Sequence, residues 1–177
     1  MSDTTYEARI VRTMEAFRKN RYDVSRFAER TAAADYLARE IRGKRVGFGD
    51  SETLRALSLY ERLSEHNEVV DPPRAGHVGG IEAFLAAGRE ALMTDIFVLS
   101  ANAITEEGQI LNMDGAGNRV AGSLFGHEKT YFVVGINKLV PNIEAGIDRI
   151  HSIAAPRNAH RKGKKTPCAA AGDRCYD

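Results

Sequence analysis

Short apolar runs alternate along this chain with longer segments in which apolar residues recur every three or four positions. The short runs predict β-strands at residues 44–49, 68–71, 95–100, 109–113 and 130–136. The helical spacing predicts helices at residues 6–17, 32–42, 81–92 and 142–156, a helix that opens at residues 50–54, and a helix or turn at 119–125. Strands that alternate with helices favour an α/β fold, a mostly parallel sheet with helices on both faces and N-terminal helices before it.

The length of the chain, 177 residues, suits one domain around a single core. We expect this domain to span residues 1–156, with residues 1–42 as an N-terminal helical part. Residues 157–177 form a tail that is basic and then rich in small residues, and we expect this tail to be partly disordered.

The charge balance gives no reason to expect a nucleic acid or a membrane as partner. The formal net charge is +1, from 25 basic and 24 acidic residues. No apolar run approaches the roughly 20 residues that a membrane-spanning helix needs. The first segment carries charges throughout and lacks the apolar centre of a secretion signal. We therefore expect a cytoplasmic protein. The apolar face formed by Ile81, Phe84 and Leu85 suits either the core or a homodimer interface.

The two cysteines, Cys168 and Cys175, both lie in the last ten residues, which excludes a disulfide scaffold for the domain. Their spacing is too wide for a zinc knuckle, and two thiolates cannot complete a tetrahedral metal site. His160 could add a third ligand. The alternative is a tail with two idle thiols.

Residues 102–121 combine asparagines, carboxylates, an arginine and glycines between two apolar runs, and we call this segment the signature loop. Small and polar residues at this density suit a connection whose backbone closely approaches a ligand. The predicted ligand-binding residues of the loop are Asn102, Thr105, Asp114, Asn118 and Arg119. The preferred general base or nucleophile is Glu106, because it follows a strand beside hydrogen-bonding side chains.

The signature loop also has a purely structural interpretation. Asp114 could tie a turn at residues 114–117 to itself through its carboxylate and the turn amides, and Arg119 could pair with Glu106 or with Asp114. A calcium loop is excluded, because an EF-hand needs an oxygen ligand at Ala116 and a glutamate where Ser123 stands.

Two further segments should gather at the same edge of the sheet, since ligands of open parallel sheets lie beyond the carboxyl ends of the strands. The turn at residues 47–51 joins a strand to a helix, and its Gly49 and Ser51 are predicted to contact a ligand. The alternative is a tight turn in which Asp50 or Ser51 caps the helix. Lys138 follows the last strand and is predicted to bind an anion or act as a base or nucleophile, or else to be a solvated turn residue.

The chain resembles the LUD domain family, named for lactate utilisation, from about Val46 to the tail. The matching pieces are Gly47-x-Gly49-x-Ser51-x-Thr53-Leu54, Asn102-Ala103-Ile104-Thr105-Glu106-x-Gly108, Asn112-x-Asp114-Gly115-x-Gly117-Asn118-Arg119-Val120, Gly135-x-Asn137-Lys138, Ala154-Ala155-Pro156-x-Asn158-Ala159 and Thr166-Pro167-Cys168. The resemblance implies a three-layer α/β fold akin to CoA transferases and ribose-5-phosphate isomerase. It also implies a cysteine-rich tail suited to a metal or an iron–sulfur cluster. Such a group is expected here only if that tail is complete.

Two functions follow as hypotheses. The first is binding of a small anionic metabolite at the carboxyl ends of the strands, in the utilisation of lactate or a related organic acid. The second is a non-catalytic accessory subunit that docks on an iron–sulfur oxidoreductase. Whether the protein turns over a substrate is left open by the sequence.

Overall fold

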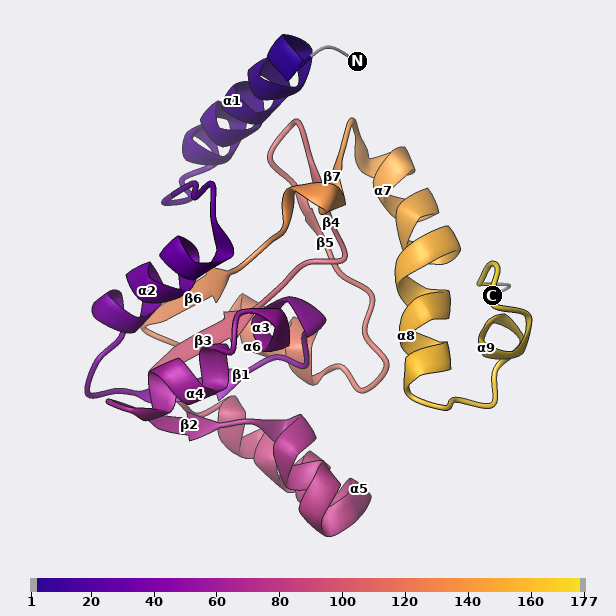
Figure 1. Cartoon of the computed structure of the whole chain (residues 1–177). Coiled ribbons are helices and arrows are strands. Elements are labelled where there is room, and N and C mark those ends of the chain that lie inside the picture. Colours follow the sequence, from indigo (N-terminus) through magenta and orange to yellow (C-terminus); the bar gives the residue numbers. More distant parts are fainter. Residues whose placement is uncertain (1–2, 176–177) are drawn as a thin grey trace. The chain divides into compact units, whose positions relative to one another are not determined.

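The computed structural model describes residues 3–175, and the chain divides into two compact units (Figure 1). Unit 1 is built from the segments Met1–Ser25, Ala101–Met113 and Gly135–Asp177. Unit 2 is built from Arg26–Ser100 and Asp114–Val134. No helix of the described chain is long and apolar enough to cross a membrane.

Unit 2 contains a four-stranded sheet in the order β2–β1–β3–β6 in which every neighbouring pair is parallel. Its strands are β1 (Arg45–Phe48), β2 (Glu68–Val70), β3 (Ile96–Leu99) and β6 (Lys129–Phe132). Its helices are α2 (Arg30–Glu40), α3 (Glu52–Ala56), α4 (Leu59–Ser64), α5 (Pro72–Ala91) and α6 (Asn118–Leu124). The predicted mostly parallel α/β fold is confirmed.

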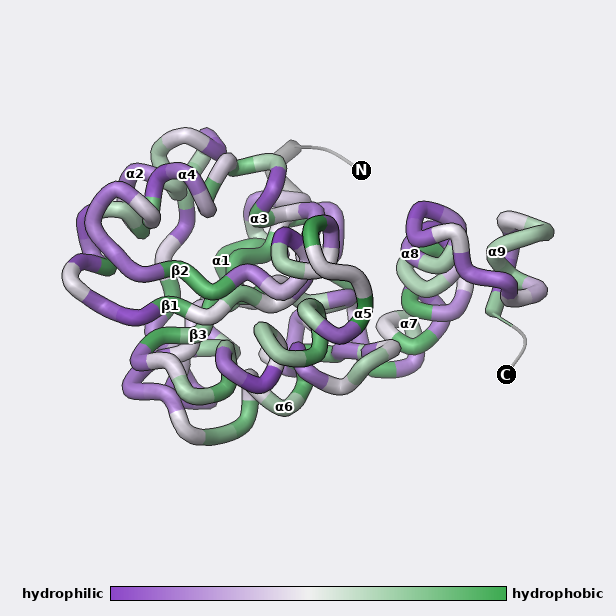
Figure 2. The backbone as a smooth tube through the Cα atoms, turned by 90° about the horizontal axis from the view of Figure 1, so that it is seen from below, coloured by the Kyte–Doolittle hydropathy of each residue, from purple (hydrophilic) through white to green (hydrophobic). Residues whose placement is uncertain are grey.

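The alternation of side chains along β3 divides unit 2 into three layers. Ile96 and Val98 pack in one core with apolar residues of α2, α3 and α4. Phe97 and Leu99 point to the other face, where they pack with Ala87 and Ala91 of α5. All four strand residues are buried, as expected of a parallel strand covered on both faces. Figure 2 shows the corresponding hydrophobic stretches at β2 and β3.

Unit 1 contains a smaller sheet in which β4 (Ala103–Thr105) pairs antiparallel with β5 (Ile110–Leu111) and parallel with β7 (Leu139–Val140). Its helices are α1 (Asp3–Lys19), α7 (Ile143–Arg149), α8 (Ala155–Arg161) and α9 (Pro167–Ala171), with a 3₁₀ turn at Ile136–Lys138 and a π-helical turn at Ile150–Ala154. Helix α9 and most of α8 lie in residues 157–177, the segment for which the sequence predicts partial disorder.

Several predicted boundaries differ from the structure. The strand predicted at 130–136 ends at Phe132, because the chain leaves unit 2 after Val134 and its next residues form a 3₁₀ turn of unit 1. The single helix predicted from residues 50–54 is two helices, separated at Ser58, whose φ is 49°. The helix predicted to end near Pro156 continues through it. A π-helical turn at Ile150–Ala154 directly precedes α8, so the helical path continues past Pro156 with a local change in its hydrogen bonding.

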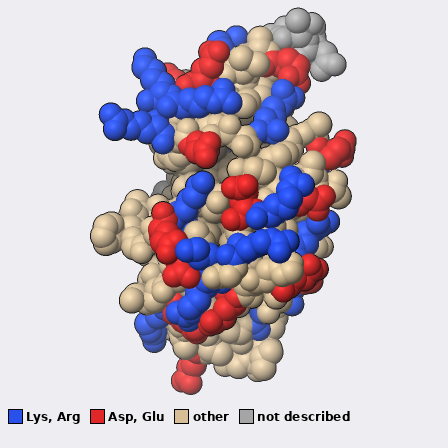
Figure 3. All heavy atoms as spheres, turned by 90° about the vertical axis from the view of Figure 1, so that its left-hand side faces the viewer, with Lys and Arg blue, Asp and Glu red and all other residues tan. Residues whose placement is uncertain are grey.

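Helix α5 begins at Pro72, earlier than predicted, and is kinked at Gly79 and Gly80, where Gly80 has a φ of +69°. His77 lies in the first part of this helix, before the kink. Asp71 caps it, since the Arg74 N–H donates to Asp71 Oδ1 at 3.4 Å. On the face of the molecule that Figure 3 shows, basic and acidic side chains are interspersed, as the balanced net charge leads one to expect.

Two glycines in the helices of unit 2 predict opposite effects of the same substitution. A Cβ at Gly122 of α6 would lie 2.5 Å from Phe97 Cζ, and Phe97 is fully buried. Gly122→Ala should therefore lower the free energy of unfolding by about 1–3 kcal/mol through overpacking. Gly88→Ala in α5 is the control, because the nearest atom to its Cβ is 3.8 Å away. That variant should be stabilised by roughly 0.5–1 kcal/mol through helix propensity. Urea unfolding measures both, and a destabilisation of equal size in the two variants would contradict the packing described here.

Candidate functional site

The switch point of the unit 2 sheet lies between β1 and β3. From β1 the chain crosses to β2 on one side, and β3 pairs with β1 on the other side. In open α/β sheets, ligands bind outside the carboxyl ends of the strands at such a point. Gly49 follows β1 directly, and its N–H donates to the Val98 carbonyl oxygen of β3 at 2.9 Å. Gly49 therefore sits at the switch point, and its predicted contact with a ligand stays a prediction.

Ser51 has the capping role that the sequence analysis gives as the alternative. Its Oγ accepts a hydrogen bond from the Leu54 N–H at 3.4 Å, at the start of α3. The residue is only 8% exposed. The Ser51 hydroxyl thus caps α3. A ligand could contact only the small part of Ser51 that is exposed.

Arg119 lies directly over the switch point. A Cβ at Gly49 would stand 2.9 Å from Arg119 Cγ and 2.9 Å from Leu99 Cβ, so only glycine leaves room for this side chain. The Arg119 guanidinium approaches Asp114, with 3.5 Å between Nη2 and Oδ1, and both side chains are 13% exposed. Of the two pairings predicted for Arg119, the structure has the one with Asp114.

Asp114 organises the second half of the signature loop. Its carboxylate accepts hydrogen bonds from the N–H groups of Gly115 at 3.0 Å, Arg119 at 2.8 Å and Val120 at 3.3 Å. The turn is therefore tied to itself in the way that the structural interpretation predicts. The same bonds fix the start of α6, and with it the backbone that carries Arg119.

Asn118 lies beside Arg119 at the first position of α6. Its side-chain nitrogen is buried and has no hydrogen-bond partner among the described residues. A buried donor without an acceptor costs free energy. Asn118 is thus a predicted site residue whose side-chain nitrogen makes no hydrogen bond to the described residues.

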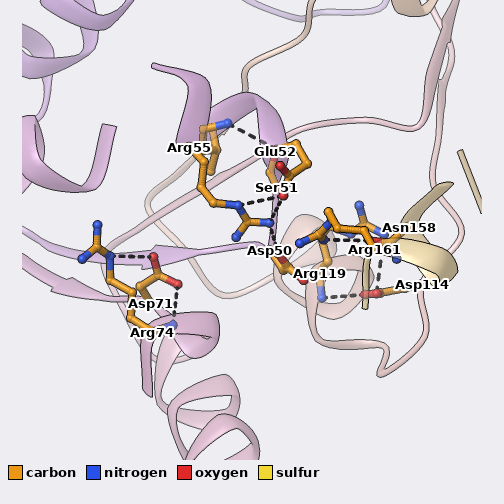
Figure 4. A network of polar contacts seen from close by, with 11 residues as sticks. Asp50, Ser51, Glu52, Arg55, Asp71, Arg74, Asp114, Arg119, Asn158 and Arg161 are labelled. Atoms are coloured by element: carbon orange, nitrogen blue, oxygen red, sulfur yellow. Dashed lines mark hydrogen bonds and ion pairs between the residues drawn. The ribbon is translucent and has the colours of Figure 1, made fainter. Parts of the chain in front are cut away.

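A network of charges that the sequence analysis missed lies at the carboxyl ends of β1 and β2 (Figure 4). Asp50 follows β1 and pairs with Arg55 at 2.8 Å, and Arg55 also binds Glu52. Burial alone would lower the pKa of Arg55, but hydrogen bonds to Asp50 and Glu52 outweigh it and raise the pKa. The sequence signal that could have found this pair is position, because Asp71 directly follows β2 and Asp50 lies two residues after the end of β1.

Asp71 is the second carboxylate of this network. Burial raises its pKa above the ordinary value and the Asp50 charge adds to the rise, whereas the Arg74 N–H and guanidinium oppose it. The Arg74 guanidinium lies 3.6 Å from Asp71 Oδ2 and stacks over the Tyr60 ring, 3.8 Å from its centroid. Asp50 and Asp71 thus form a mostly buried acidic pair with an arginine beside each.

In unit 1, the first half of the signature loop holds its own hairpin together. The Asn102 N–H donates to Asn112 Oδ1 at 3.1 Å, and the Met113 N–H donates to Asn102 Oδ1 at 2.8 Å. Thr105 is fully buried, and its Oγ1 accepts a hydrogen bond from the Gln109 N–H at 3.1 Å. These polar side chains therefore fix the β4–β5 connection.

Glu106, the predicted base or nucleophile, is paired with two arginines of α1. Arg9 Nε donates to Glu106 Oε1 at 2.7 Å, and Arg12 Nη2 lies 3.5 Å from Oε2. A role as base or nucleophile would require Glu106 to leave these ion pairs. Lys138, the other predicted catalytic residue, ends the 3₁₀ turn before β7 in the same unit and is half-buried.

The cysteines do not form a complete metal site within the described chain. Cys168 is buried and lies 3.3 Å from Thr166 Oγ1, whereas the Cys175 N–H donates to the His151 carbonyl at 2.8 Å. The His160 ring bonds the Ala169 carbonyl at 3.1 Å. Residues 3–175 contain no group of three or more His, Cys, Asp or Glu side chains that could hold a metal ion. The donor set does not fit a cluster or a tetrahedral metal, and metal binding by the two cysteines stays a prediction.

Comparison with known proteins identifies the family. The model of the LUD domain matches residues 10–175, which is nearly the whole chain, so this protein belongs to the LUD domain family. The family implies a role related to lactate utilisation. No curated protein and no solved structure matches the chain. The likeness to CoA transferases and ribose-5-phosphate isomerase therefore stays a prediction.

The raised pKa of Asp71 predicts a stability cost that grows with pH. Below the unfolded-state pKa, both states hold the proton and the cost is absent. As the pH rises through that pKa, the carboxyl ionises first in the unfolded chain, and the free energy of unfolding falls until the folded group also ionises. In Asp71→Asn this fall should be missing, because the amide does not titrate and can still cap α5.

Urea unfolding of the wild type and Asp71→Asn at about pH 3 and about pH 7 measures the effect. Glu82→Gln, an exposed position on the same helix, is the control for loss of a carboxylate. The stability of Asp71→Asn relative to the wild type should increase with pH, and a difference that is constant or reversed would contradict the assignment.

The ion pairs of Glu106 predict a structural effect of its substitution. Glu106→Gln should lower the free energy of unfolding by about 1–2 kcal/mol, because the partly buried Arg9 loses its charged partner. Glu107→Gln, at the exposed neighbouring position, should change stability by less than about 0.5 kcal/mol. Thermal and urea unfolding compare the two, and equal stability of both variants would show that the contact with α1 contributes nothing.

Proposed function

We propose that this LUD-domain protein binds a small anionic metabolite at the carboxyl ends of the unit 2 strands and acts in the utilisation of lactate or a related organic acid. The observation that carries the proposal is the position of Arg119 over Gly49 at the switch point. A guanidinium has five N–H donors in a planar fork, which matches the geometry of a carboxylate or phosphate.

The surroundings of Arg119 support a site prepared in advance for a ligand. Asp114 fixes the backbone at the start of α6 and orients the guanidinium, so little side-chain entropy is left to lose on binding. The neighbouring Asn118, another residue predicted to bind the ligand, has a buried side-chain nitrogen without a partner among the described residues. Ser100 Oγ donates to Thr53 Oγ1 at 3.3 Å beyond the end of β3, which adds hydroxyl groups to this edge.

A second candidate function is supported by exposed apolar side chains of unit 2. Val78 and Ile81 of α5 are 93% and 68% exposed, and Leu124 and Phe125 at the end of α6 are 77% and 93% exposed. Contiguous exposed apolar groups mark interaction surfaces in soluble proteins. An accessory subunit that docks on an iron–sulfur oxidoreductase would use such a surface, with or without a metabolite of its own.

Thermal unfolding with a panel of ligands tests the first function. The panel contains lactate, pyruvate, sugar phosphates, CoA esters, folates and nucleotides. A ligand at about 100 times its Kd adds roughly 2.7 kcal/mol to the free energy of unfolding, which raises Tm by several degrees. We expect a carboxylate or phosphate ligand to raise Tm in the wild type and to lose this effect in Arg119→Ala.

Arg45→Ala is the matched control, because Arg45 begins β1 at the amino end of the sheet and makes exposed ion pairs with Glu68 and Glu90. This variant should keep the ligand response. A response that survives in Arg119→Ala, with both variants folded, would contradict the site. Absence of any response in the wild type, together with capture of an iron–sulfur oxidoreductase, would favour the accessory subunit.

A further inference from the structure

A polar pocket lies on unit 2, at the end of the sheet opposite to the switch point. Helix α2 ends just before β1 begins, and α4 ends just before β2 begins, so both helix ends lie at the amino ends of the strands. Between them is a pocket of about 280 Å³. Its charged and polar lining consists of Asp35, Arg39, Arg42, Arg62, Glu65 and His66.

The three arginines of this pocket differ in their ion pairs with other described residues. Arg62 is paired with Asp35 across the two helices. Arg39 and Arg42 line the same pocket, and neither side chain has a hydrogen bond or an ion pair within residues 3–175. Two exposed arginines with unused donors therefore line a pocket that His66 also lines.

The usual structural role of such arginines, binding the last carbonyls of a helix, is already filled by another residue. Asn67 Nδ2 donates to the Ile41 carbonyl at 2.8 Å and to the Leu63 carbonyl at 2.9 Å. The Gly43 N–H donates to the His66 carbonyl at 2.9 Å. These carbonyls at the ends of α2 and α4 are thus satisfied without Arg39 or Arg42, although the helix dipoles still favour positive charge there.

We propose that this pocket binds the phosphoryl group of a small phosphorylated metabolite. Two unpaired guanidiniums match the double charge and the oxygen geometry of a phosphoryl group, whereas a monocarboxylate would need only one. An extended polyanion is disfavoured, because Asp35 and Glu65 line the same pocket. The site shares no residue with the one at Arg119.

Calorimetric titration of the full chain with inorganic phosphate, at ionic strength held constant with chloride, tests the proposal. We expect saturable binding. The Kd should rise about tenfold or more in Arg39→Gln/Arg42→Gln, because the loss of a charge-assisted hydrogen bond weakens binding by about that factor. The imidazole signals of His66, assigned by their loss in His66→Gln, should shift when phosphate is added. Glycerol 2-phosphate should bind at least as tightly as phosphate.

The control Arg30→Gln/Arg89→Gln removes the same charge from two exposed positions outside the pocket and should change the Kd by no more than about twofold. Circular dichroism checks that both double variants fold. Absence of phosphate binding by the wild type, equal loss in both double variants, or exclusion of glycerol 2-phosphate would each overturn the proposal. Binding lost in Arg119→Ala but kept in Arg39→Gln/Arg42→Gln would assign phosphate to the strand-end site and would also overturn it.

Discussion

The parallel pairing of β1 with β3 is the constraint on which the larger unit depends. Val46 and Gly47 are in register with Ile96 and Phe97, which places two strands separated by α3, α4, β2 and α5 side by side at the centre of the sheet. A parallel pair needs a crossover connection, and that crossover supplies helices for both faces. The close fit of Gly47 against Ala91 and Phe97 allows α5 to approach the strands. The same pairing also creates the switch point beneath Arg119.

Much of the fold followed from apolar periodicity, because strands buried on both faces and amphipathic helices leave strong local patterns. The strand at 96–99 is an example. The capping of α3 by Ser51 was one of two roles that the sequence left open for this residue. The strand expected up to Ile136 was overextended, since its last residues are equally apolar but belong to the other unit. Local hydropathy does not record which sheet a residue joins.

Within the candidate site, contacts between residues close in the chain were easier to predict than contacts between distant ones. The sequence left Arg119 to pair with Glu106 or with Asp114, and the structure has the pair with Asp114, which lies five residues away. The partners of Glu106 are 94 and 97 positions away on α1, and no local signal relates Arg9 or Arg12 to that carboxylate. Similarly, the buried pair Asp50 and Asp71 comes from two different strand ends. Polar residues of a motif can thus serve the backbone, as Asn102 and Thr105 do, as readily as they serve a ligand.

The division of the chain into two units limits how the protein can be truncated or recombined. The boundaries fall at residues 25, 100, 113 and 134, so the polypeptide passes between the two units four times and neither unit is one continuous stretch of gene. Truncation from either end removes part of unit 1 before it reaches unit 2. Isolation of unit 2 would require a new covalent joint between Ser100 and Asp114, in place of the hairpin that forms the first half of the signature loop. The exchange of one terminal segment of the gene therefore cannot replace one unit alone. We expect the two units to be inherited together.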